Sequence, residues 1–184
     1  MSLTDKNGQK FSPGFLKRFD EGAFWESYVA TVLSRNGLYV LHEPTHLGET
    51  VDKNKSYSCD LQVSMDPMLE VSIPVEVKSK NLRFGDSFAD YPDADIKVCS
   101  QKWFLKNWPG YDCTGRDFLF VSTKTNSILW LPQGTKVQLG VESFDKYYGY
   151  TETWATARAD QLQPLSSFVA MVKAADPWSV YAKA

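Results

Sequence analysis

Residues 57–78 read YSCDLQVSMDPMLEVSIPVEVK, and this stretch decides the fold. Apolar and polar residues alternate in two segments, 57–65 and 71–78, and a period of two is typical of half-buried β-strands. A turn around Pro67 separates the two segments. The stretch therefore predicts an antiparallel β-hairpin.

The alternation also predicts which residues face each other across the hairpin. A turn centred on Met68 places every apolar residue on one face, since a slip of one residue would send that set to the other face. The other face then carries Asp60 opposite Glu76, with Lys78 two residues further along. The predicted apolar pairs are Cys59 with Val77, Leu61 with Val75, and Val63 with Ile73.

Two carboxylates across a strand pair lie roughly 5 Å apart and repel unless a proton or cation separates them. The predicted face around Asp60 and Glu76 offers oxygen ligands without His or Cys, which favours Mg²⁺ or Mn²⁺. The alternative is a solvated strand face on which ion pairs contribute under about 1 kcal/mol. A second acidic-x-Lys triplet, residues 95–97, is expected at the start of a helix.

A helix is predicted from Phe15 to Asn36, because apolar residues recur at helical spacing and Asn36-Gly37 is a typical helix end. Glu26 interrupts its inward-facing stripe. A buried carboxylate is costly unless it is paired or bound to a metal, so Glu26 is expected to join the acidic face of the hairpin. In the alternative, a small rotation of the helix leaves Glu26 at the water boundary.

The rest of the chain predicts alternating strands and helices in an α/β protein. Residues 1–13 are expected to be a mobile lead-in. The other predicted elements are a strand at 38–41, a loop at 42–56, a helix from about Ala94 to Trp108, strands at 118–122 and 127–131, a β-like patch at 136–141, a Tyr-rich stretch at 147–154, and a C-terminal helix starting near Pro164.

Composition limits the class of protein. With 184 residues, of which 43% are hydrophobic, the chain suits a single domain. No apolar run is long enough to span a membrane, and the three cysteines follow no disulfide pattern, so we expect a cytoplasmic protein without membrane contact. The net charge of −2 means that any surface for DNA must come from local clusters of Lys and Arg.

These motifs resemble those of the PD-(D/E)xK nuclease superfamily, over residues 15–131, with residues 134–184 as an elaboration. The resemblance implies a restriction-endonuclease-like core, in which a helix, three antiparallel strands, a second helix and a further strand follow each other and form a mixed sheet of about four to five strands flanked by helices. It also implies that Asp60, Glu76, Glu26 and the backbone carbonyl of Val77 hold one or two Mg²⁺ or Mn²⁺ ions. Lys78 would then stabilise the attacking water or the phosphate.

DNA contacts are expected downstream of the predicted metal site. A solvated helix face is the alternative for each lysine taken singly, and for the two histidines, His42 and His46, a loop role or none is favoured over metal binding. The predicted contacts are Ser79, Lys80 and Arg83, which continue from the catalytic strand, and Lys97, Gln101 and Lys102 on the helix that follows.

The predicted function is a Mg²⁺-dependent deoxyribonuclease, an endonuclease of the phage, prophage or restriction and recombination type. Cleavage of both strands would ordinarily require a homodimer. The alternative is a non-catalytic nucleic-acid-binding or assembly module that retains the nuclease fold. Neither a hydrolase triad motif nor a nucleotide-binding glycine fingerprint is present.

Overall fold

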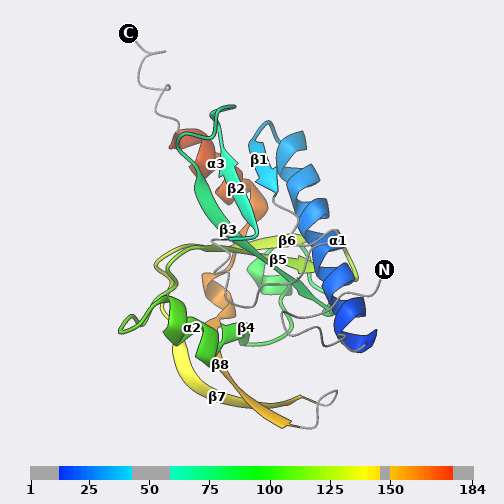
Figure 1. The fold of residues 1–184 in the computed structure, drawn as a ribbon, viewed down its shortest axis with the longest axis vertical. Coiled ribbons are helices and arrows are strands. Elements are labelled where there is room, and N and C mark those ends of the chain that lie inside the picture. Colours follow the sequence, from blue (N-terminus) through cyan, green and yellow to red (C-terminus); the bar gives the residue numbers. More distant parts are fainter. Residues whose placement is uncertain (1–12, 43–58, 146–149, 176–184) are drawn as a thin grey trace, which may run out of the picture. The chain divides into compact units, whose positions relative to one another are not determined.

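The computed structural model describes residues 13–42, 59–145 and 150–175 (Figure 1). Two compact units divide the chain after Ser79 and after Phe168. The first unit contains the beginning and the end of the chain, the second unit the middle, and each is described by itself. The predicted lead-in before Pro13, most of the loop at 42–56 and His46 lie outside the described residues, and the single domain stays a prediction.

The first unit begins with α1 (Pro13–Arg35), as predicted. Val29 and Leu33, one turn apart, are both fully buried and anchor the helix to its unit. The helix ends because Gly37 adopts a φ of 81°, a conformation that costs glycine little. The N–H of Leu38 then donates to the carbonyl of Leu33 at 3.2 Å, as in a glycine C-cap.

Three antiparallel strands follow in the first unit, in the order β1 (Tyr39–His42), β2 (Leu61–Ser64) and β3 (Ile73–Lys80). Helix α1 packs against β1. Leu61 pairs with Val75 and Val63 with Ile73, which confirms the predicted hairpin register. Leu61, Val63 and Val75 are buried and Ile73 is half-buried, so the predicted apolar face does face the interior.

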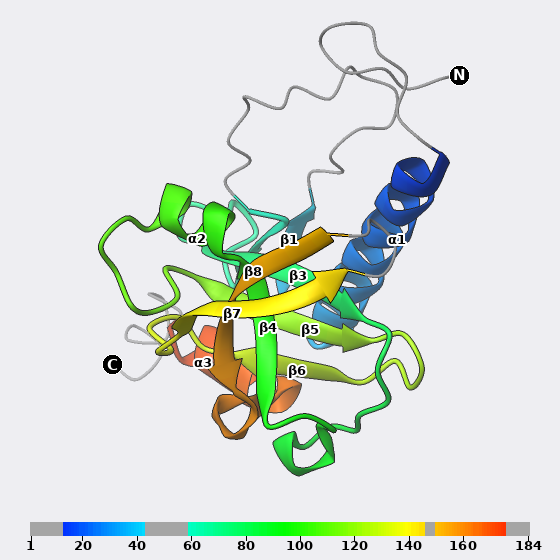
Figure 2. The same ribbon diagram turned by 90° about the horizontal axis from the view of Figure 1, so that it is seen from below.

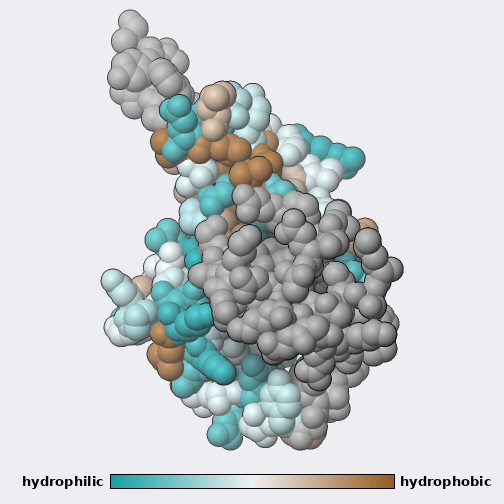
Figure 3. Space-filling view, viewed as in Figure 1, coloured by the Kyte–Doolittle hydropathy of each residue, from teal (hydrophilic) through white to brown (hydrophobic). Residues whose placement is uncertain are grey.

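The turn of the hairpin is held by Asp66, whose carboxylate accepts from the N–H groups of Met68 at 2.9 Å and Glu70 at 3.1 Å. The turn therefore lies around Pro67, as predicted. Met68 and Val71 beside it are 75% and 57% exposed. Figure 3 shows hydrophobic residues gathered over this part of the first unit.

The second unit contains two antiparallel groups of strands. One consists of β5 (Asp117–Ser122), β6 (Ile128–Leu131) and the short β9 (Gln163–Pro164), in that order, which confirms the strand pair predicted at 118–131. The other has the order β4 (Asp95–Ser100), β8 (Tyr150–Arg158) and β7 (Gln138–Asp145), and Figure 2 shows its long β7–β8 pair. The β-like patch thus contributes to β7, and the described part of the Tyr-rich stretch, from Tyr150 onward, belongs to β8.

The prediction of a helix from Ala94 to Trp108 is wrong for the first half of that range. Residues 95–100 form β4, and only Gln101–Asn107 are helical, as α2. Ile96 and Val98 are buried at alternate positions against β8, and this short period of two was hidden by the apolar residues of the helix that follows. Ser100 ends the strand and caps the helix by accepting from the N–H of Trp103. The 95–97 triplet and Lys97 therefore lie on a strand.

The third described helix, α3 (Leu165–Ala174), begins directly after Pro164, as predicted. It starts in the second unit and ends in the first. Two short 3₁₀ helices complete the described elements, η1 (Phe88–Asp90) and η2 (Ala159–Gln161). The predicted α/β class is confirmed. Among the described residues, no helix combines the length and apolar character needed to cross a bilayer.

Candidate metal centre

Asp60 lies immediately before β2, where the hairpin ladder stops. Its Oδ2 accepts from the N–H of Val77 at 2.7 Å, and its own N–H donates to the carbonyl of Val75 at 3.1 Å. A regular ladder would give Val77 a backbone partner, but the Asp60 side chain takes that place. Pairing therefore ends at Leu61 and Val75, and the predicted ladder pairs Asp60 with Glu76 and Cys59 with Val77 do not form.

Glu76 and Lys78 project from the same side of β3, as their spacing of two predicts. Lys78 Nζ lies 2.9 Å from Glu76 Oε2 and 3.8 Å from Asp60 Oδ2. One ammonium thus joins both carboxylates, which confirms that the three side chains share a face. The Glu76 side chain is only 6% exposed and that of Asp60 22%, so the alternative of a solvated strand face does not hold.

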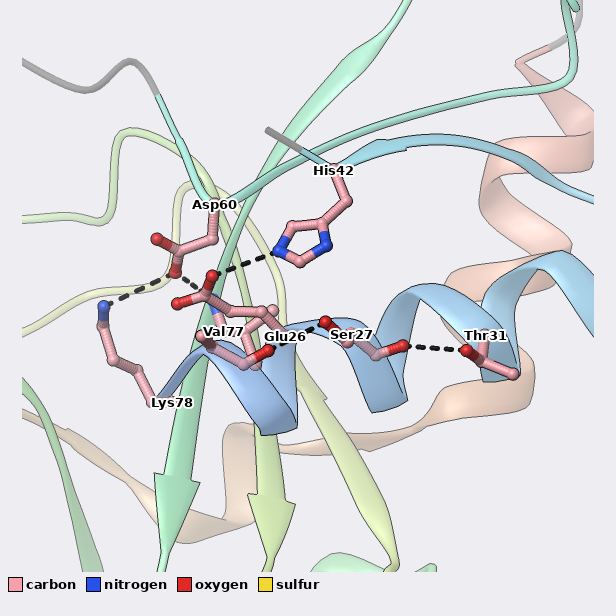
Figure 4. A network of polar contacts seen from close by, with 8 residues as sticks. Glu26, Ser27, Thr31, His42, Asp60, Val77 and Lys78 are labelled. Carbon is pink, nitrogen blue, oxygen red and sulfur yellow. Dashed lines mark hydrogen bonds and ion pairs between the residues drawn. The ribbon is translucent and has the colours of Figure 1, made fainter. Parts of the chain in front are cut away.

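Glu26 on α1 points into the first unit toward the end of β1, and Figure 4 shows it beside Asp60 and Lys78. Its Oε2 lies 3.3 Å from His42 Nε2, and both side chains are 16% exposed. The prediction of an inward Glu26 is confirmed, and the alternative at the water boundary does not hold. Sequence reasoning missed His42 as a neighbour of Glu26, although its place at the end of the strand beside β2 could have indicated it.

Burial and surplus negative charge together set the electrostatics of the site. The pKa of Asp60 is raised from 3.8 to about 7, chiefly by burial and also by the charges of Glu76 and Glu26. The Lys78 ammonium and the hydrogen bond from Val77 act in the opposite direction but do not cancel the effect. Asp60 therefore retains a proton at pH values where ordinary carboxyl groups are ionised.

The residues fit a hard divalent cation in their chemistry, because their donors are carboxylate oxygens and their charge is in excess. They do not form a ready-made cluster. No group of three His, Cys, Asp or Glu side chains within the described ranges is arranged to hold a metal ion as it stands. Lys78 occupies the position between Asp60 and Glu76, so metal binding requires this ammonium to move aside. The Val77 carbonyl stays a prediction as a ligand.

Most of the predicted DNA contacts lie in the second unit, while Ser79 is exposed on β3 in the first. Lys80 Nζ donates to the carbonyl of Lys97 at 2.6 Å, and Lys97 Nζ bonds to Ser143 and lies over the Trp154 ring. Gln101 accepts from the N–H of Gly140 at 2.6 Å. These three side chains therefore have structural partners. The remaining two predicted contacts, Arg83 and Lys102, are exposed.

Comparisons with known proteins give no relative. No protein-family model, no curated protein and no solved structure matches this chain.

Proposed function

We propose that this chain is a metal-dependent nuclease that hydrolyses phosphodiester bonds in DNA, built on a restriction-endonuclease-like core. The proposal rests above all on one observation. Asp60, Glu76 and Glu26, from three separate segments, share a half-buried site with Lys78, and the pKa of Asp60 is raised to about 7. A buried carboxyl group with a raised pKa beside specific charged partners is typical of functional sites.

Glu26, Asp60 and Glu76 would hold the cation, which we propose to be Mg²⁺ or Mn²⁺. When bound, such an ion lowers the pKa of a coordinated water and neutralises negative charge on a phosphate. Asp60 is the central ligand because its Oδ2 is fixed by the Val77 N–H, so its orientation is set before any ligand arrives. The element order also supports the core, since α1, β1, β2 and β3 follow each other as the resemblance implies.

Lys78 would change partners during the reaction. Without a cation, its ammonium neutralises Asp60 and Glu76. With a cation held by those carboxylates, the Lys78 ammonium would be free to donate hydrogen bonds to a non-bridging oxygen of the scissile phosphate or to the attacking water. The lysine stem is long and a third of the side chain is exposed, so this movement requires no backbone change.

His42 would position Glu26. Its ring nitrogen lies within reach of one Glu26 oxygen, which leaves the other oxygen of that carboxylate to face the site.

The second candidate function, a non-catalytic module that binds DNA or assembles with a partner, is favoured by the absence of a ready-made metal cluster in the described part of the chain. A cytoplasmic, homodimeric endonuclease of the phage or restriction type is our first proposal.

The test is an assay of DNA cleavage. Purified protein is incubated with linear duplex, branched and single-stranded DNA in Mg²⁺, in Mn²⁺ and in EDTA. We expect cleavage of at least one substrate with either metal and none in EDTA. Matched reactions contain Asp60→Ala and, as a control, Asp86→Ala, which removes an exposed carboxylate in the second unit. Equal cleavage by the wild type and Asp60→Ala would overturn the assignment of the site.

A further inference from the structure

A groove runs along α1 away from the candidate metal centre, wholly within the first unit. Its volume is about 560 Å³. One end of the groove is formed by His42, which contacts the metal-site residue Glu26, so the groove begins at that site. The described residues that line it are Ser27, Ala30, Thr31, Ser34, Arg35 and His42.

The far end of the groove is positively charged. Arg35, the last residue of α1, is exposed and forms no ion pair within the described ranges, and no described carboxylate lines the groove. The ammonium of Lys173 lies 3.9 Å from the place that a Cβ on Gly37 would take, just beyond the helix end. These two cations oppose the negative end of the helix dipole, which would otherwise repel an anion there.

Hydroxyl groups line the groove between its two ends. Ser27 Oγ donates to the carbonyl of Ala23 and Thr31 Oγ1 to that of Ser27, each at 2.9 Å, and Figure 4 shows both side chains on one side of α1. These are bonds to neutral carbonyls of the same helix, which contribute little to helix stability. A phosphate oxygen is a charged and therefore stronger acceptor, so a bound phosphate can draw these hydroxyl protons to itself.

Phe24 adds an aromatic surface on the groove side of α1, one turn before the lining residue Ser27. It lies three residues before Ser27 and seven before Thr31, so helical spacing places all three on one face of α1. Phe24 is 62% exposed, and its ring meets Trp25 edge-on, with the centroids 5.1 Å apart. An exposed ring beside a phosphate-binding groove is suited to stack on an unpaired base.

We propose that the face of α1 from Phe24 to Arg35 binds one unpaired DNA strand next to the metal centre, with Phe24 under a base and Ser27, Thr31, Ser34 and Arg35 along the phosphates. This inference rests on the proposed nuclease function and names its substrate as DNA with a single-stranded segment. The twelve residues from Phe24 to Arg35 span roughly 16 Å of helix axis, enough to follow several consecutive phosphates of one strand.

The test measures the affinity of the protein for a short fluorescein-labelled oligothymidine. Binding is detected by fluorescence anisotropy, and EDTA is present so that metal-dependent cleavage cannot occur. We expect Arg35→Ala to weaken binding about fivefold to tenfold and to lower the salt dependence by about 0.7 in log–log slope, the value for one lost phosphate contact on a single strand. Phe24→Ala removes the stacking surface and should weaken binding about tenfold. Thr31→Val, which keeps the side-chain shape, should have a smaller effect in the same direction.

The charge-matched control is Lys124→Ala, an exposed lysine in a turn of the second unit, for which we expect less than about a twofold change. A duplex of the same sequence composition should bind more weakly than the single strand. If the Arg35→Ala and Phe24→Ala proteins bind the oligonucleotide as tightly as the control does, the groove is not the DNA-binding site, even if Asp60-dependent cleavage is observed. Conversely, Arg35-dependent binding without any cleavage would support DNA binding by the groove and contradict the proposed nuclease activity.

Discussion

Asp60→Asn is expected to reduce DNA cleavage in Mg²⁺ by at least about 10³-fold while the protein stays folded. Asn keeps an oxygen that can accept from the Val77 N–H, so the end of the hairpin is preserved. It removes the negative charge that would hold the cation. Because the ionised form of Asp60 is disfavoured by burial and by two neighbouring carboxylates, the loss of this charge also relieves repulsion in the metal-free protein.

The control for this prediction is the stability of the variant itself. Asp60→Asn should unfold at an equal or higher denaturant concentration than the wild type at about pH 8, since the folded wild type resists ionisation of Asp60 until about pH 7. Loss of cleavage together with loss of stability would mean that the substitution disrupts the hairpin. Retained cleavage in the stable variant would contradict a role of Asp60 in metal binding.

Lys78→Met is expected to lower the free energy of unfolding by about 2 kcal/mol at about pH 8 in the absence of divalent ions. The substitution leaves Glu76, which is 6% exposed, and Asp60 without the ammonium that joins them. The effect is smaller than for a fully buried pair because a third of the Lys78 side chain is exposed to water. The free energy of unfolding is measured by urea titration, with tryptophan fluorescence as the signal.

The pH dependence of this effect follows from the raised pKa of Asp60. A carboxyl group whose folded pKa lies above its unfolded value stabilises the fold fully below the unfolded pKa of 3.8, and this contribution is lost as the pH rises through about 7. Loss of Lys78 raises the pKa further, so the defect of Lys78→Met should shrink at about pH 5. Added Mg²⁺ should also restore stability at high pH, because a ligand bound only by the folded state stabilises it.

An unchanged stability of Lys78→Met at high pH would contradict this account of the site. Lys102→Met serves as the matched control, since this exposed lysine on α2 forms no ion pair within the described ranges. It should leave the free energy of unfolding within about 0.5 kcal/mol of the wild type. Destabilisation by both substitutions would indicate a general effect of charge removal instead of an effect at the acidic site.

The hairpin was predictable because two independent signals agree on it. The period of two assigns the faces, and the turn around Pro67 sets the register, so Leu61 meets Val75 as expected. The inward direction of Glu26 was predictable from the small and apolar residues around it. The irregular end at Asp60 was not, because it depends on a side chain replacing a backbone partner of Val77.

Other features depend on contacts between segments far apart in the sequence. β4 is a strand because Ile96 and Val98 pack against β8, more than fifty residues later in the chain, whereas their local sequence runs directly into a helix. His42 meets Glu26 only because β1 folds back along α1. Lys97 was predicted to contact DNA, but its ammonium instead bonds to Ser143 and lies over the Trp154 ring. Such pairings leave no local pattern in the sequence.

The most direct test of the metal centre is a calorimetric titration of the protein with Mn²⁺, which requires neither the substrate nor the reaction. The wild type should bind one or two Mn²⁺ ions with release of protons at about pH 7, since Asp60 must give up its proton to become a ligand. Asp60→Asn should lose this binding, and the control Asp86→Ala should retain it. Mn²⁺ binding of the same stoichiometry and affinity in Asp60→Asn, or none in the wild type, would contradict the proposed site.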